Sequence, residues 1–285
     1  MLQGKFALGF WRLCDANISL NELENLINVA LDNGISVMDH ADIYGEYRCE
    51  ARFGEVLKSQ PSLRDKMYLV SKCGIKFKCD FTPNNLVKHY DLSADSIITS
   101  VNNSLANLGC DYLDLLLVHR PSPLMNVDEI AETFYQLQRE GKVKQFGVSN
   151  FTPSQFDLLN SRIPLLTNQI EFSVLANQAL FDGSLDQLQQ YKLRPMAWSP
   201  LAGGKIFNSD KPQLTQLLQE LADKYAVSVE QIALAWILRH PSNIQIVLGT
   251  QKSSRLINTL AAQHIELDIQ DWFAILETVN GYPVA

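Results

Sequence analysis

The segment Leu113-Asp-Leu-Leu-Leu-Val118 decides the fold, because it is an almost continuous apolar run. Such a run is typical of a parallel β-strand that is covered on both faces, whereas a strand with one face in water alternates apolar and polar residues. Helical periodicity precedes the run at residues 93–108 and follows it at residues 127–140. Each helical segment ends at a glycine, Gly109 or Gly141, as helices commonly do. This order predicts alternating helices and parallel strands.

The same alternation continues along the whole chain. We expect eight strands, at residues 5–9, 36–39, 67–71, 113–118, 145–148, 167–170, 194–198 and 244–248. None of the fourteen glycines forms G-x-G-x-x-G or G-x-x-x-x-G-K, the phosphate loops that often mark a doubly wound sheet. No linker or shift in composition divides the sequence. The sequence therefore predicts an α/β protein, a single (β/α)₈ TIM barrel domain over residues 1–285 with a parallel eight-stranded core.

Composition excludes several classes of partner. The 285 residues contain 24 Lys+Arg and 31 Asp+Glu, a net charge of −7, with no run of basic residues. Nucleic acid and anionic membranes are therefore not expected as partners. No segment reaches the roughly 18 apolar residues of a membrane helix. The five cysteines are scattered without C-x-x-C, so neither a disulfide framework nor a metal site is indicated. We expect a cytoplasmic monomer.

Polar residues at the strand ends indicate where the chemistry occurs, because active sites of such barrels lie at the carboxyl ends of the strands. Asp39 and Tyr44 follow the second predicted strand, Lys72 the third and His119 the fourth. An acid, a phenol, an amine and an imidazole from adjacent strands form an acid–base set.

These four side chains suit the protonation of a carbonyl oxygen. Tyrosine ionises at about pH 10, and a neighbouring ammonium such as that of Lys72 lowers this pKa. The carboxylate of Asp39 would keep the lysine charged, and His119 could donate a hydrogen bond to a developing alkoxide. No serine or cysteine of the set lies beside a histidine, so acyl transfer is poorly supported.

Several motifs in this order resemble the aldo-keto reductase family. The segment Val37-Met-Asp-His-Ala-Asp-Ile-Tyr-Gly45, continued by Glu50 and Gly54, resembles its signature. Val70-Ser-Lys72 is similar to its lysine strand and Asp114-Leu-Leu-Leu-Val-His-Arg-Pro121 to its histidine strand. The later segments Gly147-Val-Ser-Asn-Phe151, Asn168-Gln-Ile-Glu-Phe172 and Ala197-Trp-Ser-Pro-Leu201 resemble its cofactor-binding segments.

The resemblance implies an enzyme that reduces small aldehydes and ketones with NADPH, or alternatively NADH. Tyr44 would donate the proton, Lys72 and Asp39 would tune it, and His119 would orient the substrate. Arg120, which replaces the family's usual tryptophan, would join the substrate site. Trp11, just past the first predicted strand, is expected to line the same pocket, with packing within its loop as the alternative.

The resemblance also assigns cofactor contacts. The expected set is Ser149, Asn150, Gln169 and Trp198 at the nicotinamide; Ser199, Leu201, Ala202 and Gly203 near the pyrophosphate; and Gly249, Thr250, Lys252, Arg255 and Asn258 at the adenosine end. Gly249-Thr250 replaces the Lys-Ser pair of many relatives, so the preference for NADPH depends mainly on Arg255 and Lys252.

Two alternatives remain at this stage. The first is a metal-dependent hydrolase on the same barrel, with His40, Asp42 and His119 as ligands. The second is an NADPH-binding regulatory or sensor subunit of the same fold.

Overall fold

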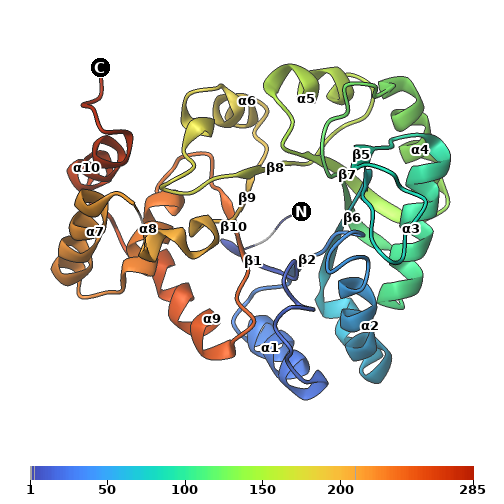
Figure 1. The fold of residues 1–285 in the computed structure, drawn as a ribbon, viewed down its shortest axis with the longest axis horizontal. Coiled ribbons are helices and arrows are strands. Elements are labelled where there is room, and N and C mark those ends of the chain that lie inside the picture. Colours follow the sequence, from blue (N-terminus) through green and yellow to red (C-terminus); the bar gives the residue numbers. More distant parts are fainter. Residues whose placement is uncertain (1, 3, 209) are drawn as a thin grey trace.

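The computed structural model describes residues 2, 4–208 and 210–285, and its centre is a closed barrel of eight parallel strands (Figure 1). The strands are β1 (Phe6–Gly9), β2 (Val37–Asp39), β3 (Tyr68–Cys73), β6 (Leu113–Val118), β7 (Val143–Ser149), β8 (Asn168–Glu171), β9 (Met196–Trp198) and β10 (Gln245–Leu248). Their order around the barrel is β1-β10-β9-β8-β7-β6-β3-β2, and β1 pairs with β2 to close it. Each predicted strand overlaps one of these, so the prediction of a TIM barrel is confirmed.

Helices surround the barrel as an outer ring (Figure 1). They are α1 (Leu20–Asp32), α2 (Cys49–Ser59), α3 (Ala94–Leu108), α4 (Val127–Arg139), α5 (Pro153–Asn160), α6 (Ser184–Gln190), α7 (Pro212–Tyr225), α8 (Val229–Leu238), α9 (Ser253–Leu260) and α10 (Ile269–Asn280). Short 3₁₀ helices are η1 (Pro61–Lys66), η2 (Gln178–Leu180), η3 (Ala202–Phe207) and η4 (Ala261–His264). Gly109 and Gly141 follow α3 and α4 with φ of 67° and 73°, a left-handed conformation that ends the helix.

The packing of strand β6 shows why its sequence is apolar apart from Asp114. Leu115 and Leu117 belong to the cluster that fills the barrel interior, together with residues such as Val70 and Val247. Leu116 and Val118 belong to the larger cluster between the strands and the helices. Both faces of the strand are therefore removed from water, which an alternating pattern would not allow.

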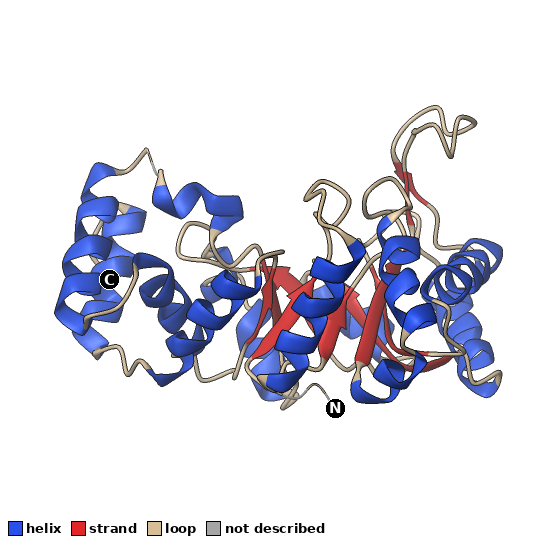
Figure 2. Cartoon of the chain, turned by 90° about the horizontal axis from the view of Figure 1, so that it is seen from below, coloured by secondary structure: helices blue, strands red, loops and turns tan. Residues whose placement is uncertain are grey.

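One element was not predicted from the sequence. The segment after β3 forms a small antiparallel hairpin from β4 (Ile75–Lys76) and β5 (His89–Tyr90). Figure 2 shows this hairpin projecting beyond one rim of the barrel, while the helices near the C-terminus extend the molecule at the opposite side. In the described part of the chain, no helix is long and apolar enough to cross a membrane.

Candidate active site

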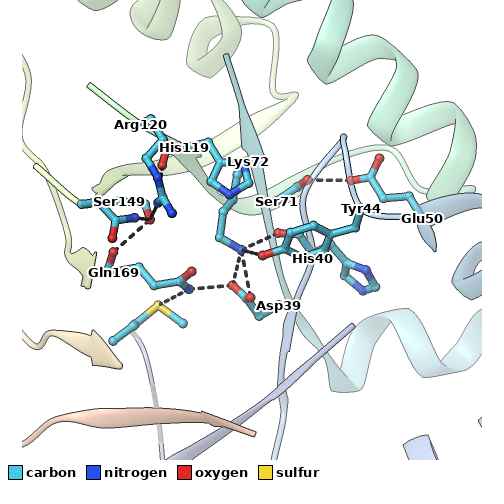
Figure 3. Close-up of polar contacts among 12 residues, drawn as sticks. Asp39, His40, Tyr44, Glu50, Ser71, Lys72, His119, Arg120, Ser149 and Gln169 are labelled. Carbon is cyan, nitrogen blue, oxygen red and sulfur yellow. Dashed lines mark hydrogen bonds and ion pairs between the residues drawn. The ribbon is translucent and has the colours of Figure 1, made fainter. Parts of the chain in front are cut away.

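The four residues of the predicted acid–base set come together at the carboxyl ends of neighbouring strands (Figure 3). Asp39 is the last residue of β2 and Lys72 lies near the end of β3. His119 directly follows β6, and Tyr44 lies in the loop after β2. Because β2, β3 and β6 are adjacent in the barrel, side chains that are 33 to 80 positions apart meet at one point.

Lys72 is the centre of the set, and its side chain is fully buried. Its Nζ lies 2.9 Å from each carboxylate oxygen of Asp39 and 2.7 Å from the carbonyl oxygen of His40. It also donates to the phenol oxygen of Tyr44 at 3.1 Å. Within the described residues the Tyr44 hydroxyl donates to no protein acceptor, so its own proton is available to a bound substrate.

Burial and charge act against each other in this group. Burial lowers the pKa of Lys72, but the raising effects of Asp39 and Tyr44 are together larger. The pKa of Lys72 is therefore above its ordinary value. Burial raises the pKa of Tyr44 and outweighs the lowering effect of Lys72. Lys72 thus acts in the predicted direction, but the net downward shift expected for Tyr44 is not found. Tyr44 is therefore a protonated phenol at neutral pH.

His119 is a neutral side chain beside the tyrosine. Burial, followed by the positive charges of Lys72 and Arg120, holds its pKa well below the ordinary range. Its ring lies edge-on to that of Tyr44, with 5.9 Å between the ring centroids. Its Nδ1 atom is buried without a partner among the described residues. A neutral imidazole carries one N–H, which can donate to a carbonyl oxygen.

The residues expected at the nicotinamide form one hydrogen-bonded chain. Trp198 Nε1 donates to Asn150 Oδ1 at 3.0 Å, and Asn150 Nδ2 donates to Ser149 Oγ at 2.6 Å. Ser149 Oγ in turn donates to the backbone oxygen of Gln169 at 2.9 Å. The side chain of Gln169 donates to Asp39 at 2.8 Å, so this amide also joins the lysine network, a contact that the sequence did not reveal.

The segment after β9 forms a backbone cradle. Ser199, Ala202, Gly203 and Gly204 all have positive φ values, of 54°, 50°, 66° and 96°. The N–H groups of Ala202 and Gly204 donate to the backbone oxygens of Ser199 and Leu201, at 2.8 and 2.9 Å, so Gly203 is the residue of this turn whose N–H can serve an anion. A Cβ atom built on Gly203 would lie 3.5 Å from Nη2 of Arg12, which reaches this segment from the loop after β1. Arg12 was not predicted as a cofactor contact, because nothing in the sequence shows that it lies near Gly203.

The residues expected at the adenosine end lie after β10. Gly249 has open space where a Cβ would stand, and Thr250 Oγ1 accepts the backbone N–H of Lys252 at 3.2 Å. Lys252 and Arg255 are exposed at the start of α9, and their side chains have no ion pair among the described residues. Asn258 instead contacts α8, where it donates to Glu230 and its Oδ1 accepts from Gln231 at 3.3 Å.

Three further residues of the predicted set lie around the site. Trp11 is 54% exposed, and its ring centroid is 6.4 Å from that of Tyr44. Leu201 packs against the core beside the cradle. Arg120 follows His119, and its guanidinium carbon lies 5.5 Å from the Trp198 ring centroid.

The three ligands of the hydrolase alternative do not converge. His40 stacks on Phe10 at 4.6 Å and meets Phe53 of α2 edge-on at 4.4 Å, so it lies among apolar rings. Asp42 accepts from Ser100 of α3 at 2.6 Å, whereas His119 packs against Tyr44. Across the residues that the structure describes, no group of three or more His, Cys, Asp or Glu side chains could hold a metal.

A second buried polar group lies behind the site. Glu50 of α2 is 1% exposed and accepts from Ser71 Oγ at 2.6 Å, while its other oxygen has no partner among the described residues. Burial, reinforced by the charge of Asp42, raises its pKa to about 7. Ser71 and Lys72 are neighbours on β3 whose side chains enter different buried networks (Figure 3).

Comparison with known proteins agrees with this geometry. The model of the aldo/keto reductase family matches residues 5–280. The chain belongs to the aldo/keto reductase family. As a member of this family it is an NAD(P)H-dependent oxidoreductase.

Individual relatives of this aldo/keto reductase cover almost its full length. Oxidoreductase YdhF of Escherichia coli is 48% identical over 98% of this chain and 95% of its own length. The 6-dehydroglucose reductase of Agrobacterium fabrum is 42% identical over 99% of this chain and 96% of its own. A crystal structure of a Klebsiella pneumoniae aldo/keto reductase with NADP and acetate has a TM-score of 0.80 and 24% identity, covering 99% of this chain and 93% of that one.

Proposed function

We propose that this aldo/keto reductase reduces small aldehydes and ketones to alcohols with NADPH, and that Tyr44 is the proton donor. The observation that carries the proposal is the contact of 3.1 Å between Lys72 Nζ and the Tyr44 oxygen, with Asp39 on the other side of the lysine. A buried ammonium that is held by a carboxylate beside a phenol stabilises the phenolate that proton donation leaves behind.

The protein's residues have separate parts in this reaction. His119 donates its N–H to the carbonyl oxygen and orients it toward Tyr44. As negative charge develops on that oxygen, the Tyr44 hydroxyl transfers its proton there. The Lys72 ammonium strengthens its hydrogen bond to the phenolate oxygen, and Asp39 keeps the lysine charged. The nicotinamide supplies the hydride when it is bound.

The residues present fit a dinucleotide phosphate. The N–H of Gly203 in the left-handed turn 202–204 would serve the pyrophosphate, and Arg12 would add a cation beside it. Trp198, held by Asn150, offers an indole for the nicotinamide ring. The exposed cations Lys252 and Arg255 would bind the 2′-phosphate, which favours NADPH over NADH. Of the predicted set, Asn258 has the weakest support because its amide already contacts α8.

The relatives suggest which carbonyl compounds to test first. Two of them, 42% and 35% identical, are named 6-dehydroglucose reductase. We infer that polar sugar aldehydes belong in the initial substrate panel. We also infer that the chain acts as a single-domain, cytoplasmic monomer, which size-exclusion chromatography with light scattering tests.

The decisive experiment replaces Tyr44 by Phe and follows NADPH oxidation with a panel of aldehydes. We expect kcat to fall by about 10²- to 10⁴-fold, while the Kd for NADPH changes less than twofold. Tyr47→Phe, three positions along the same loop, is the matched control and should keep the wild-type rate. Full turnover by Tyr44→Phe would refute the assignment. Tight NADPH binding by the wild type without reduction of any carbonyl would favour the regulatory subunit.

A further inference from the structure

We propose that the site selects carbonyl substrates that carry a carboxylate close to the reacting carbonyl group, and that Arg120 binds this carboxylate. The inference rests on the proposed reductase function and specifies its substrate class. It starts from Arg120, which is a partly buried cation at the active site without a carboxylate partner among the described residues.

The position of Arg120 is defined by the end of β6. Its Nη1 donates to the backbone oxygen of His119 at 3.1 Å and to Ser149 Oγ at 3.4 Å. Figure 3 shows the guanidinium group extending between His119 and Ser149, on the same side as the lysine network. The guanidinium therefore faces the place where the substrate carbonyl would lie.

Two other buried cations are neutralised, whereas Arg194, which also makes no ion pair among the described residues, lies before β9 and donates to the backbone oxygens of Asn243 and Leu2. Lys72 is paired with Asp39 at 2.9 Å, and Arg64 is paired with Asp114 at 2.8 Å. For Arg120, no carboxylate oxygen of residues 2, 4–208 or 210–285 lies within 4.0 Å. Two neutral oxygen acceptors leave several of its five N–H donors unused.

The electrostatic surroundings also favour an anion. Burial lowers the pKa of Arg120, which is the expected cost of an uncompensated cation, yet a guanidinium remains charged in proteins. The positive charge of Lys88, in the segment between β4 and β5, also lowers the pKa of His119. Its effect is smaller than those of burial, Lys72 and Arg120. The negative charge of Glu171, at the end of β8, raises the pKa of Arg120. Glu171 is exposed, however, and does not form an ion pair with Arg120. An arriving carboxylate would provide the missing partner.

The guanidinium of Arg120 lies close to His119. Its Nη1 is 3.1 Å from the His119 backbone oxygen, so the long side chain folds back toward the histidine. If His119 binds the carbonyl oxygen, a carboxylate on Arg120 is separated from the carbonyl by only a few bonds. The geometry points to 2-oxo acids and short aldehyde acids.

The test compares pairs of substrates that differ only in charge. The pairs are glyoxylate with glyoxylamide, succinic semialdehyde with 4-oxobutanamide, and 2-carboxybenzaldehyde with 2-formylbenzamide. In the wild type we expect kcat/KM to be about 10- to 100-fold higher for the carboxylate in at least one pair, as a charge-assisted hydrogen bond would give. In Arg120→Gln this ratio should fall to within about twofold of one, and Arg120→Lys should retain part of it. Lys58→Gln removes the same charge from α2 and should keep the wild-type ratio.

The possible outcomes separate the two proposals. If the wild type reduces neither member of any pair and no other carbonyl, the reductase function itself fails. If it reduces both members equally, only the role of Arg120 fails. A Kd for NADPH that rises in Arg120→Gln while the ratio stays unchanged would overturn the proposal and assign Arg120 to the cofactor. Preference for glyceraldehyde 3-phosphate over glyceraldehyde, without any carboxylate preference, would overturn the choice of carboxylate.

Discussion

Replacement of Glu50 by Gln should change how the stability of the protein depends on pH. Glu50 is buried behind the active site, with one oxygen bonded to Ser71 and the other without a partner among the described residues. Its pKa is raised from an ordinary value of 4.5 to about 7, mainly by burial. Between these two values the folded state binds more protons than the unfolded state, so this group stabilises the fold fully below pH 4.5 and progressively less up to pH 7.

The size of the effect follows from the shift. Each pKa unit corresponds to about 1.4 kcal/mol, so Glu50 should remove about 3 kcal/mol of the free energy of unfolding between pH 4.5 and pH 8. Glutamine has nearly the same shape and does not ionise. The free energy of unfolding of Glu50→Gln, relative to the wild type, should therefore increase by about 3 kcal/mol over this range. His40 titrates in the opposite sense, with a pKa of about 3, but it is present in both proteins and cancels.

The assay is urea denaturation of both proteins at half-unit steps of pH, followed by tryptophan fluorescence. Glu55→Gln is the matched control on the same helix, because Glu55 is half-exposed and its ion pair with Arg52 is at the surface. The free energy of unfolding of Glu55→Gln should remain within about 0.5 kcal/mol of the wild-type value at every pH. If the difference in free energy of unfolding between Glu50→Gln and the wild type is equally independent of pH, the pKa of Glu50 is not raised by burial and the reasoning is refuted.

Two further predictions concern the active site directly. Asp39→Asn leaves the buried Lys72 ammonium without its partner, so we expect a loss of about 3 to 5 kcal/mol of stability by thermal or chemical denaturation, together with a fall in kcat of about 10²-fold; wild-type stability would contradict the pairing. Arg12→Gln should raise the Kd for NADPH about tenfold in a fluorescence titration and weaken its dependence on salt, because Arg12 lies beside Gly203 of the backbone cradle; an unchanged Kd would exclude Arg12 from the pyrophosphate site.

The barrel could be predicted because its information is local. Each strand is a short apolar run, and several helices stop at a glycine that the structure places in the left-handed region, as at Gly109 and Gly141. The β4–β5 hairpin was missed because each of its strands has only two residues, too few to show a pattern.

The candidate site was only partly predictable, because some of its contacts are not encoded locally in the sequence. Asp39, Lys72 and Tyr44 could be placed together because strand ends in a barrel converge. The contact of Gln169 with Asp39 joins residues 130 positions apart, and Arg12 approaches Gly203 of η3, which is distant in the sequence. Both depend on side-chain directions that only the assembled fold defines. The net pKa of Tyr44 was misjudged because the sequence shows the neighbouring charge but not the depth of burial.

The β4–β5 hairpin has a consequence for how this enzyme could diversify. The side-chain hydrogen bonds of residues 75–90 remain within that segment in the described structure, for example from Thr82 and Asn85 to the backbone oxygen of Phe77 at 2.6 and 3.1 Å. None of them supports Lys72, Asp39 or Tyr44. Phe77 stacks on Tyr47, in the loop that carries Tyr44, with 5.5 Å between the ring centroids. Insertions, deletions or grafts in this hairpin that keep Phe77 can therefore reshape the entrance and alter which substrates enter, while the proton-donating group keeps its geometry. Substrate range and chemical step are thus open to separate selection, in nature or in directed evolution.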